Sequence, residues 1–222
     1  MSRTIAFITV TVLLFSSGCI IPILTTPTRN EKKVPAEYNL PKDKGKKIAV
    51  LVENPIWSNA PISMTSQLTT AITENLTDEL GLKSKNIISK EKVQAYWTTM
   101  LNSSQFSPVE LGKAVGADLV LFTQVQEFEL TQTAETEYYK GQLAGKAVLF
   151  DVATKQKLWP ESESGKPVRV AFDLEKGSYD DAVERLVNAF AHCITRYLYD
   201  CPVPKFKIFD DKSGTGWNEW QD

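Results

Sequence analysis

Two short, mostly apolar runs, separated by a long segment of helical periodicity, constrain the fold of this chain more than any other feature. The runs are 48–52 and 117–122. Apolar runs of this length are typical of buried strands in α/β proteins. Between them, residues 62–82 carry apolar side chains at helical spacing and polar ones on the other side. The sequence therefore predicts a strand, an amphipathic helix and a second strand.

Capping patterns predict shorter elements between these two strands. We expect a very short strand at 86–88 and a helix capped by Ser89. Ser107-Pro108-Val109-Glu110 has the pattern of a capping box with proline at the first helical position. Gly116 is expected to end the helix that this box begins.

The second half of the chain predicts longer strands. The second apolar run continues to Leu130, and its apolar phase changes just after Val125, which indicates a bulge. Residues 138–152 are expected to form a long strand that turns back as a hairpin into 158–159. Alternation at 168–173 predicts one more strand.

A long amphipathic helix capped by Ser178 is expected to extend to Leu198. Its first turns carry acidic residues, which the helix dipole favours at that end. The predicted fold class is α/β (α+β): a single mixed sheet of about four to five strands with three to four helices, in the order β-α-β-α-β-β-β-α.

The N-terminus has the three parts of a secretory signal: a basic start at Arg3, an apolar run at 4–15 and small residues at 16–18. The apolar run is shorter than the roughly 20 residues that a membrane-spanning helix needs. The small residues before Cys19 resemble the lipobox of bacterial lipoproteins, in which the cysteine is acylated. Ser16 departs from that box, where leucine is usual, so an ordinary secretory signal is the alternative. Ile20, in place of aspartate after the cysteine, resembles the outer-membrane sorting pattern.

These features predict four parts: a signal peptide at 1–18, a lipidated N-terminus and flexible linker at 19–45, an α/β domain at 46–201, and a loosely packed tail of acidic and aromatic residues at 202–222. Removal of the signal changes the formal net charge from −2 to −3, because the signal carries one arginine. A near-neutral chain without a basic stripe does not favour nucleic acid as a partner. Lipid on Cys19 would make the membrane a partner.

Cys193 and Cys201 remain when Cys19 is acylated, and an exported protein can join them in a disulfide. Eight residues along one helix would separate them by about 12 Å, too far for a disulfide. The bond therefore requires the helix to end near Tyr199 and the chain to turn back. The alternative is a buried thiol at Cys193 and a free one at Cys201.

The sequence contains no recognisable catalytic, metal-binding or cofactor-binding constellation, so we expect a protein that is not an enzyme. The single histidine, His192, is adjacent to Cys193 on a helix, where neighbouring side chains do not face each other. A group of glutamates around 127–137 is better explained as a solvated strand edge than as an acid–base pair. These glutamates are Glu127, Glu129, Glu135 and Glu137.

Three stretches resemble a family of envelope lipoprotein domains. They are 47–51 at the first strand, 111–122 with its Gly-Ala-Asp, and 147–159 with its "Asp…Thr…Leu-Trp". The pattern is similar to the TolB N-terminal domain, the curli secretion channel lipoprotein and the lipoprotein activators of penicillin-binding proteins. The resemblance implies a scaffold-like domain without catalytic residues.

The leading hypothesis is a lipid-anchored envelope protein, held in the outer membrane and facing the periplasm, that binds or assembles with another envelope protein. The first alternative is an auxiliary lipoprotein of a transport system that carries lipid or a small molecule. An envelope hydrolase with an unrecognised site is the second alternative.

Overall fold

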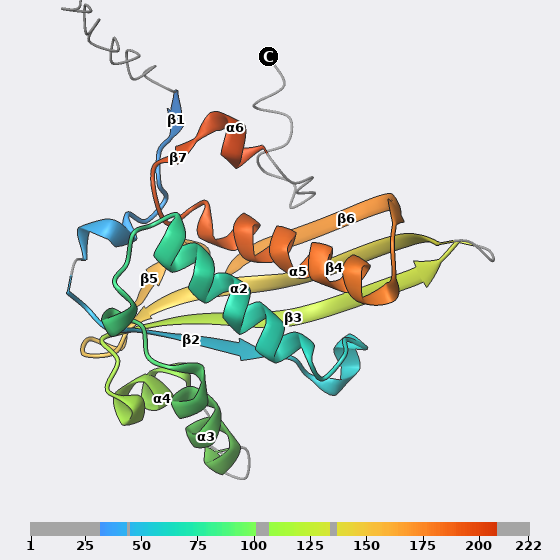
Figure 1. The fold of residues 1–222 in the computed structure, drawn as a ribbon. Helices are drawn as coiled ribbons and strands as arrows, with labels where there is room; N and C mark the ends of the chain where they lie inside the picture. Colours follow the sequence, from blue (N-terminus) through green and yellow to red (C-terminus); the bar gives the residue numbers. More distant parts are fainter. Residues whose placement is uncertain (1–31, 44, 101–106, 134–136, 208–222) are drawn as a thin grey trace, which may run out of the picture. The chain divides into compact units, whose positions relative to one another are not determined.

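The computed structural model describes residues 32–43, 45–100, 107–133 and 137–207. Five strands within these ranges form one mixed sheet (Figure 1). In chain order these strands are β2 (Ile48–Glu53), β3 (Leu119–Gln132), β4 (Tyr138–Asp151), β5 (Lys157–Trp159) and β6 (Lys166–Lys176). β2 pairs in parallel with β3, β3 pairs with β4 antiparallel, and β4 pairs antiparallel with both β5 and β6. This mixed sheet with its helices confirms the predicted fold class.

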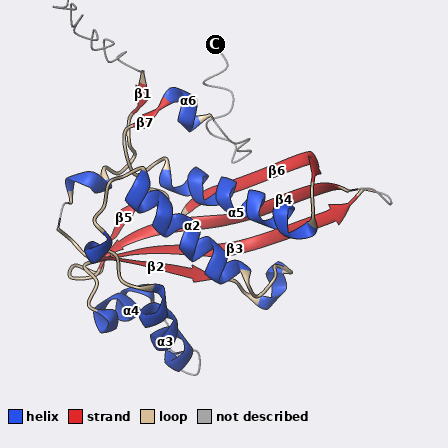
Figure 2. Cartoon of the chain, viewed as in Figure 1, coloured by secondary structure: helices blue, strands red, loops and turns tan. Residues whose placement is uncertain are grey.

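Helices pack on both faces of the sheet (Figure 2). They are α2 (Met64–Asp78), α3 (Lys90–Met100), α4 (Pro108–Val115) and α5 (Tyr179–Thr195). Side chains of a strand alternate between the two faces. Ile48 and Val50 therefore join the core beneath α2 and α5, whereas Ala49 and Leu51 join a smaller core with α3 and α4. Because both faces of β2 are buried, its sequence is apolar throughout.

The β3–β4 pair is the longest ladder of the sheet, and its details follow from particular residues. The predicted bulge is confirmed, since the register shifts between Val125 and Glu127. Gly145 lies opposite Val125 in this ladder. A Cβ atom at Gly145 would lie 2.5 Å from the carbonyl oxygen of Gln124 and 2.8 Å from the ring of Phe190 on α5. Glycine there lets α5 approach the sheet closely.

The predicted helix ends are confirmed in part. The side chain of Ser178 caps α5, as predicted, and also forms a capping box with Asp181. Gly116 ends α4 in the left-handed conformation, as expected.

The capping box predicted at Ser107 is wrong: Ser107 precedes α4, but its side chain makes no capping hydrogen bond. The predicted strand at 86–88 is only a single parallel bridge between Ile48 and Ile87.

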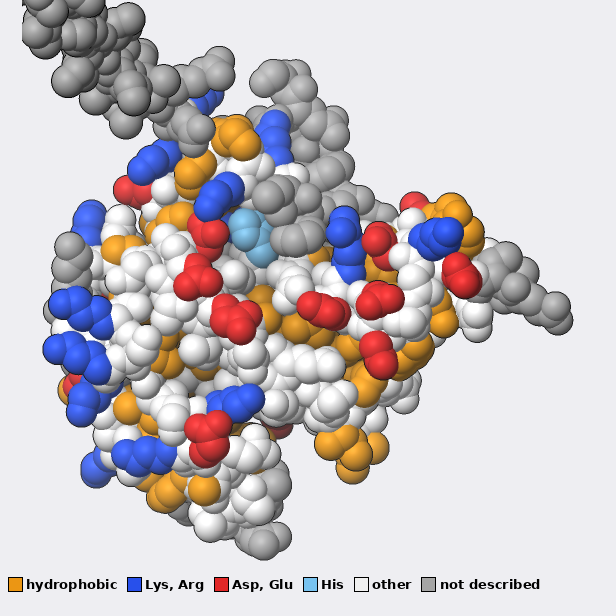
Figure 3. Space-filling view, in the orientation of Figure 1, with side chains coloured by type: hydrophobic (Ala, Val, Ile, Leu, Met, Phe, Trp, Pro, Cys, Tyr) orange, Lys and Arg blue, Asp and Glu red, His pale blue; other side chains and the backbone are white. Residues whose placement is uncertain are grey.

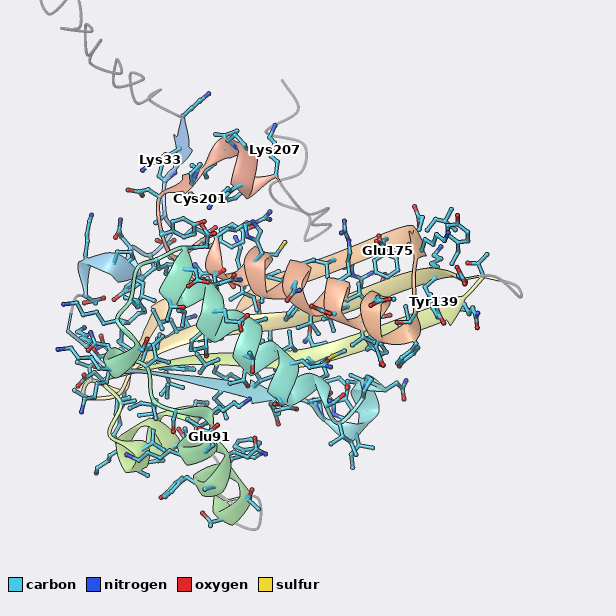
Figure 4. The ribbon with its side chains drawn as sticks, viewed as in Figure 1. Lys33, Glu91, Tyr139, Glu175, Cys201 and Lys207 are labelled. Carbon is cyan, nitrogen blue, oxygen red and sulfur yellow. The ribbon has the colours of Figure 1, made fainter. Side chains whose placement is uncertain are left out.

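Both ends of the described chain pack against the domain, which corrects two expectations. A short strand β1 (Lys33–Val34) pairs with β7 (Cys201–Pro202), and Figure 4 shows Lys33 and Cys201 on these neighbouring segments. Leu40, within the predicted linker, is 2% exposed, and Phe206 on α6 (Val203–Phe206), within the predicted tail, is 5% exposed. Packed structure therefore begins before the predicted boundary at 46 and continues beyond 201. Residues 208–222 of the predicted tail lie outside the described ranges.

Candidate binding site

The structure describes two of the three predicted site residues, Cys193 and Cys201. Cys19 falls outside the described residues, so lipidation stays a prediction. Cys193 and Cys201 are both buried, and the disulfide that the sequence permitted is not formed in the structure. The Cys201 thiol donates to the hydroxyl of Tyr199 at 3.2 Å, and burial raises its pKa. A protonated thiol is a poor nucleophile, so Cys201 is better suited to packing than to thiol chemistry.

His192 also has a structural role. Its Nε2 lies 2.7 Å from the carbonyl oxygen of Lys205, which can only accept, so Nε2 carries the proton. Burial lowers the pKa of His192, and the hydrogen bond to Lys205 opposes this shift only in part. The ring therefore holds α6 against α5 in its neutral form.

The predicted acidic group is divided. Glu127 forms an ion pair with Arg169 on β6 at 3.0 Å, which agrees with a solvated strand edge. Glu135 lies outside the described ranges. Within those ranges no cluster of histidine, cysteine or acidic side chains could hold a metal ion, and no described helix has the length and apolarity to cross a membrane.

A loop of residues 54–62, here called the Asn54 loop, connects β2 to α2 and is held by its own side chains. The amide of Asn54 donates from Nδ2 to the carbonyl oxygen of Pro61 at 3.0 Å, and its Oδ1 accepts from the hydroxyl of Ser58 at 2.6 Å. The Ser58 hydroxyl also accepts from the Ala60 amide at 3.3 Å, and Ser58 is only 2% exposed. Asn59 takes the left-handed conformation, with a φ of 60°. The loop is therefore a defined turn built around Asn54 and Ser58.

This turn places three large apolar side chains in solvent. Ile56 is 99% exposed, Ile62 95% and Trp57 61%. Figure 3 shows apolar side chains projecting from the molecule at the connection between β2 and α2. Single exposed apolar residues are ordinary, whereas several close together mark interaction sites. The Asn54 loop is the candidate binding site of this chain.

A groove extends from the loop along the edge of β2, between α2 and α3. We call it the β2 groove; its volume is about 250 Å³. Its lining consists of β2 residues, Ile62 of the loop, and residues of the two helices. They are Val50, Leu51, Val52, Ile62, Thr65, Ser66, Thr69, Lys90, Glu91, Val93, Gln94 and Trp97. Hydroxyl, amide and charged side chains lie beside apolar ones in this lining, a mixture that suits a polypeptide better than a lipid tail.

In the sequence, Pro55 and Pro61 bracket a loop that carries Trp57, but this pattern alone assigns the loop no function. The available signal was the presence of Ile56, Trp57 and Ile62 in a segment without helical or strand periodicity. Because such residues are buried in most proteins, only the structure reveals that the loop turns them outward.

No family model and no curated protein matches the chain. Among solved structures, lipoprotein GNA1162 from Neisseria meningitidis is 20% identical, with a TM-score of 0.42 over 68% of this chain and 98% of that one. The C-terminal domain of LpoB from Salmonella enterica is 16% identical, with a TM-score of 0.34 over 59% of this chain and 84% of that one. PelC from Paraburkholderia phytofirmans, a dodecamer, is 11% identical, with a TM-score of 0.43 over 75% of this chain and 96% of that one.

These structures include a bacterial lipoprotein, but identities and TM-scores this low identify no family. The resemblance to the TolB and curli lipoprotein domains stays a prediction.

Proposed function

We propose that this chain is a lipid-anchored, non-catalytic envelope protein that acts as a binding or assembly module for another envelope protein. In this proposal Cys19 holds it in the outer membrane, facing the periplasm. The observation that carries the proposal is the Asn54 loop, in which Ile56 and Ile62 are almost fully exposed. Apolar side chains held in solvent oppose solubility, so their retention favours a role in contact with another molecule.

The geometry of the loop suits protein binding. Binding loses affinity when loops must become ordered, and a turn already fixed by Asn54 and Ser58 avoids most of that cost. Tryptophan is enriched among the residues that dominate binding energy at protein interfaces. Trp57 and its two isoleucine neighbours would supply such a centre.

The position of the loop is compatible with a tether. Figure 1 shows β1, where the described chain begins, at the opposite end of the domain from the connection between β2 and α2. As the flexible linker that the sequence predicts, residues 20–32 would have an r.m.s. span of roughly 20 Å. An anchor at Cys19 would then hold the domain near the membrane and leave the Asn54 loop accessible to a partner.

Photocrosslinking in native cells tests the proposal. Benzoylphenylalanine replaces Trp57 in the full, lipidated chain, and a matched control carries it at Glu163, which is exposed in a different loop. We expect an adduct with one identifiable envelope protein from position 57 and none from position 163. The same set of adducts from both positions, or none from position 57, would contradict the proposal.

A further inference from the structure

The free edge of β2 forms the floor of the β2 groove, and its backbone polar groups point into the groove. Along a strand in a parallel ladder, successive residues direct their N–H and C=O groups to alternate sides. The carbonyl of Lys47 accepts the first amide of β3 at 2.9 Å, whereas the carbonyl of Ile48 accepts the amide of Ile88 at 2.8 Å on the other side. By the same alternation, the N–H and C=O groups of Val50 and Val52 point away from β3.

Val50 and Val52 are buried, and among the described residues no hydrogen-bond partner reaches their outward groups. Val50 is 2% exposed and Val52 is 3% exposed. In the described ranges no backbone or side-chain hydrogen bond reaches them from the open edge, because the chain leaves this edge after Ile88 and enters α3. Buried backbone N–H and C=O groups are almost always paired in folded proteins. A row of unpaired groups at the floor of a groove therefore indicates a missing strand.

We infer that an extended segment of the partner protein adds a β-strand to the sheet along Val50–Glu53. This inference rests on the proposed function and specifies how the partner binds. Addition of a strand to an exposed sheet edge is a recurring mode of peptide recognition, in which main-chain hydrogen bonds provide affinity and side-chain pockets provide specificity. At about 3.3 Å per residue, the open edge accommodates a segment of about four residues.

The two walls of the groove determine which side chains the segment needs. α2 contributes the hydroxyl side chains of Thr65 and Thr69, and α3 contributes the apolar side chains of Val93 and Trp97. Because side chains of a strand alternate between faces, one row would face each wall. Small or polar residues would face α2, and apolar residues would face α3. Figure 4 shows Glu91 at the start of α3, where charged groups border the groove.

The position of the groove favours a partner over the C-terminal residues of this chain. Ile62 belongs both to the groove and to the Asn54 loop, so one partner can contact both. Ile62 precedes α2, whereas the last described residues lie near the other end of that helix, where Lys205 pairs with Glu79 at 2.6 Å. The continuous loop and groove therefore form one surface for an external segment.

The test places benzoylphenylalanine at Gln94, on the α3 wall of the groove. The full lipidated chain is crosslinked in native cells, in parallel with the chain that carries the probe at Trp57. Mass spectrometry identifies the crosslinked peptide. We expect Gln94 and Trp57 to crosslink the same protein, with the Gln94 adduct on a segment that alternates polar and apolar residues. Val52→Pro removes one outward N–H without removing a β2–β3 hydrogen bond, and it should decrease the Gln94 adduct at least tenfold.

A second variant keeps the test decisive if the Val52→Pro protein does not fold. Thr65→Trp fills the groove from the α2 wall, and Gln67→Trp is its matched control, because Gln67 borders the depression between α2 and α5 instead. Thr65→Trp should also decrease the Gln94 adduct at least tenfold, and Gln67→Trp should leave it within twofold.

The outcomes separate the two proposals. A Trp57 adduct without a Gln94 adduct overturns strand addition and leaves the proposed function intact. A Gln94 adduct that folded Val52→Pro and Thr65→Trp proteins both retain also overturns strand addition. Crosslinks from Gln94 to residues 208–222 or to a second copy of the chain overturn the choice of occupant. Loss of both adducts from the wild-type chain overturns the proposed function itself.

Discussion

Replacement of Asn54 by alanine should destabilise the domain by about 2 kcal/mol and weaken partner binding, although Ile56 and Trp57 remain. Two well-formed hydrogen bonds are lost: the 2.6 Å bond from the Ser58 hydroxyl and the 3.0 Å bond to the Pro61 carbonyl. Each such bond contributes about 0.5–1.5 kcal/mol. The additional contact from Asn54 to Ala60 measures 3.5 Å and is too long to add much.

Urea denaturation followed by circular dichroism measures this loss, and thermal unfolding should show a decrease in Tm of roughly 4–8 °C. Asn59→Gly is the matched control in the same loop, because glycine adopts the left-handed conformation of Asn59 readily. An Asn54→Ala protein within about 0.5 kcal/mol of wild type, a change too small to count as the loss of one bond, would refute the view that Asn54 holds the loop. Crosslinking from position 57 should decrease in the same variant.

Three further predictions concern the remainder of the chain. Burial lowers the pKa of His192, so on acidification the histidine of the unfolded chain is protonated before that of the folded chain. The free energy of unfolding is therefore highest above about pH 6.5. Below that pH it decreases by at most about 1.4 kcal/mol per pH unit until the folded pKa is reached. In urea titrations the variant His192→Gln should lack this pH dependence, because glutamine does not titrate. The variant should stay folded, because the glutamine amide can still donate to the Lys205 carbonyl. Gly145→Ala should cost about 1–3 kcal/mol in the same assay, because its Cβ would lie 2.5 Å from the Gln124 carbonyl. Mass spectrometry of the mature N-terminus should find acylated Cys19; an unmodified residue there would contradict the anchor.

Much of the fold could be predicted, because a strand that is buried on both faces has an apolar sequence throughout and an amphipathic helix has apolar residues at helical spacing. The apolar β2 and the periodic α5 are confirmed with small shifts at their ends. The bulge after Val125 was predictable because a change of phase moves apolar residues to the other face. Each of these patterns is local, and each agrees with the packing of the whole domain.

The expectations that failed depended on contacts distant in sequence. Leu40 is buried because its segment hydrogen-bonds to the chain around Leu198, through the Leu40 amide and the Leu198 carbonyl at 2.9 Å. Nothing in the proline-rich sequence around Leu40 predicts that partner. The prediction at Ser107 failed in a different way. The local pattern correctly places Ser107 at the start of α4, but the serine side chain does not form the capping hydrogen bond. The exposure of Ile56 likewise depends on how the loop turns, which composition does not determine.

The two edges of the sheet differ in a way that supports a binding role for β2. Proteins usually protect exposed edge strands with proline and charged residues, which discourage the addition of another strand. β6, at one edge, has this protection: Pro167 and Asp173 are exposed, and Arg169 pairs with Glu127. β2, at the other edge, is apolar from Ile48 to Val52 and lies beside an open groove. Selection for solubility alone would protect both edges, so the unprotected edge is the one expected to acquire a partner strand.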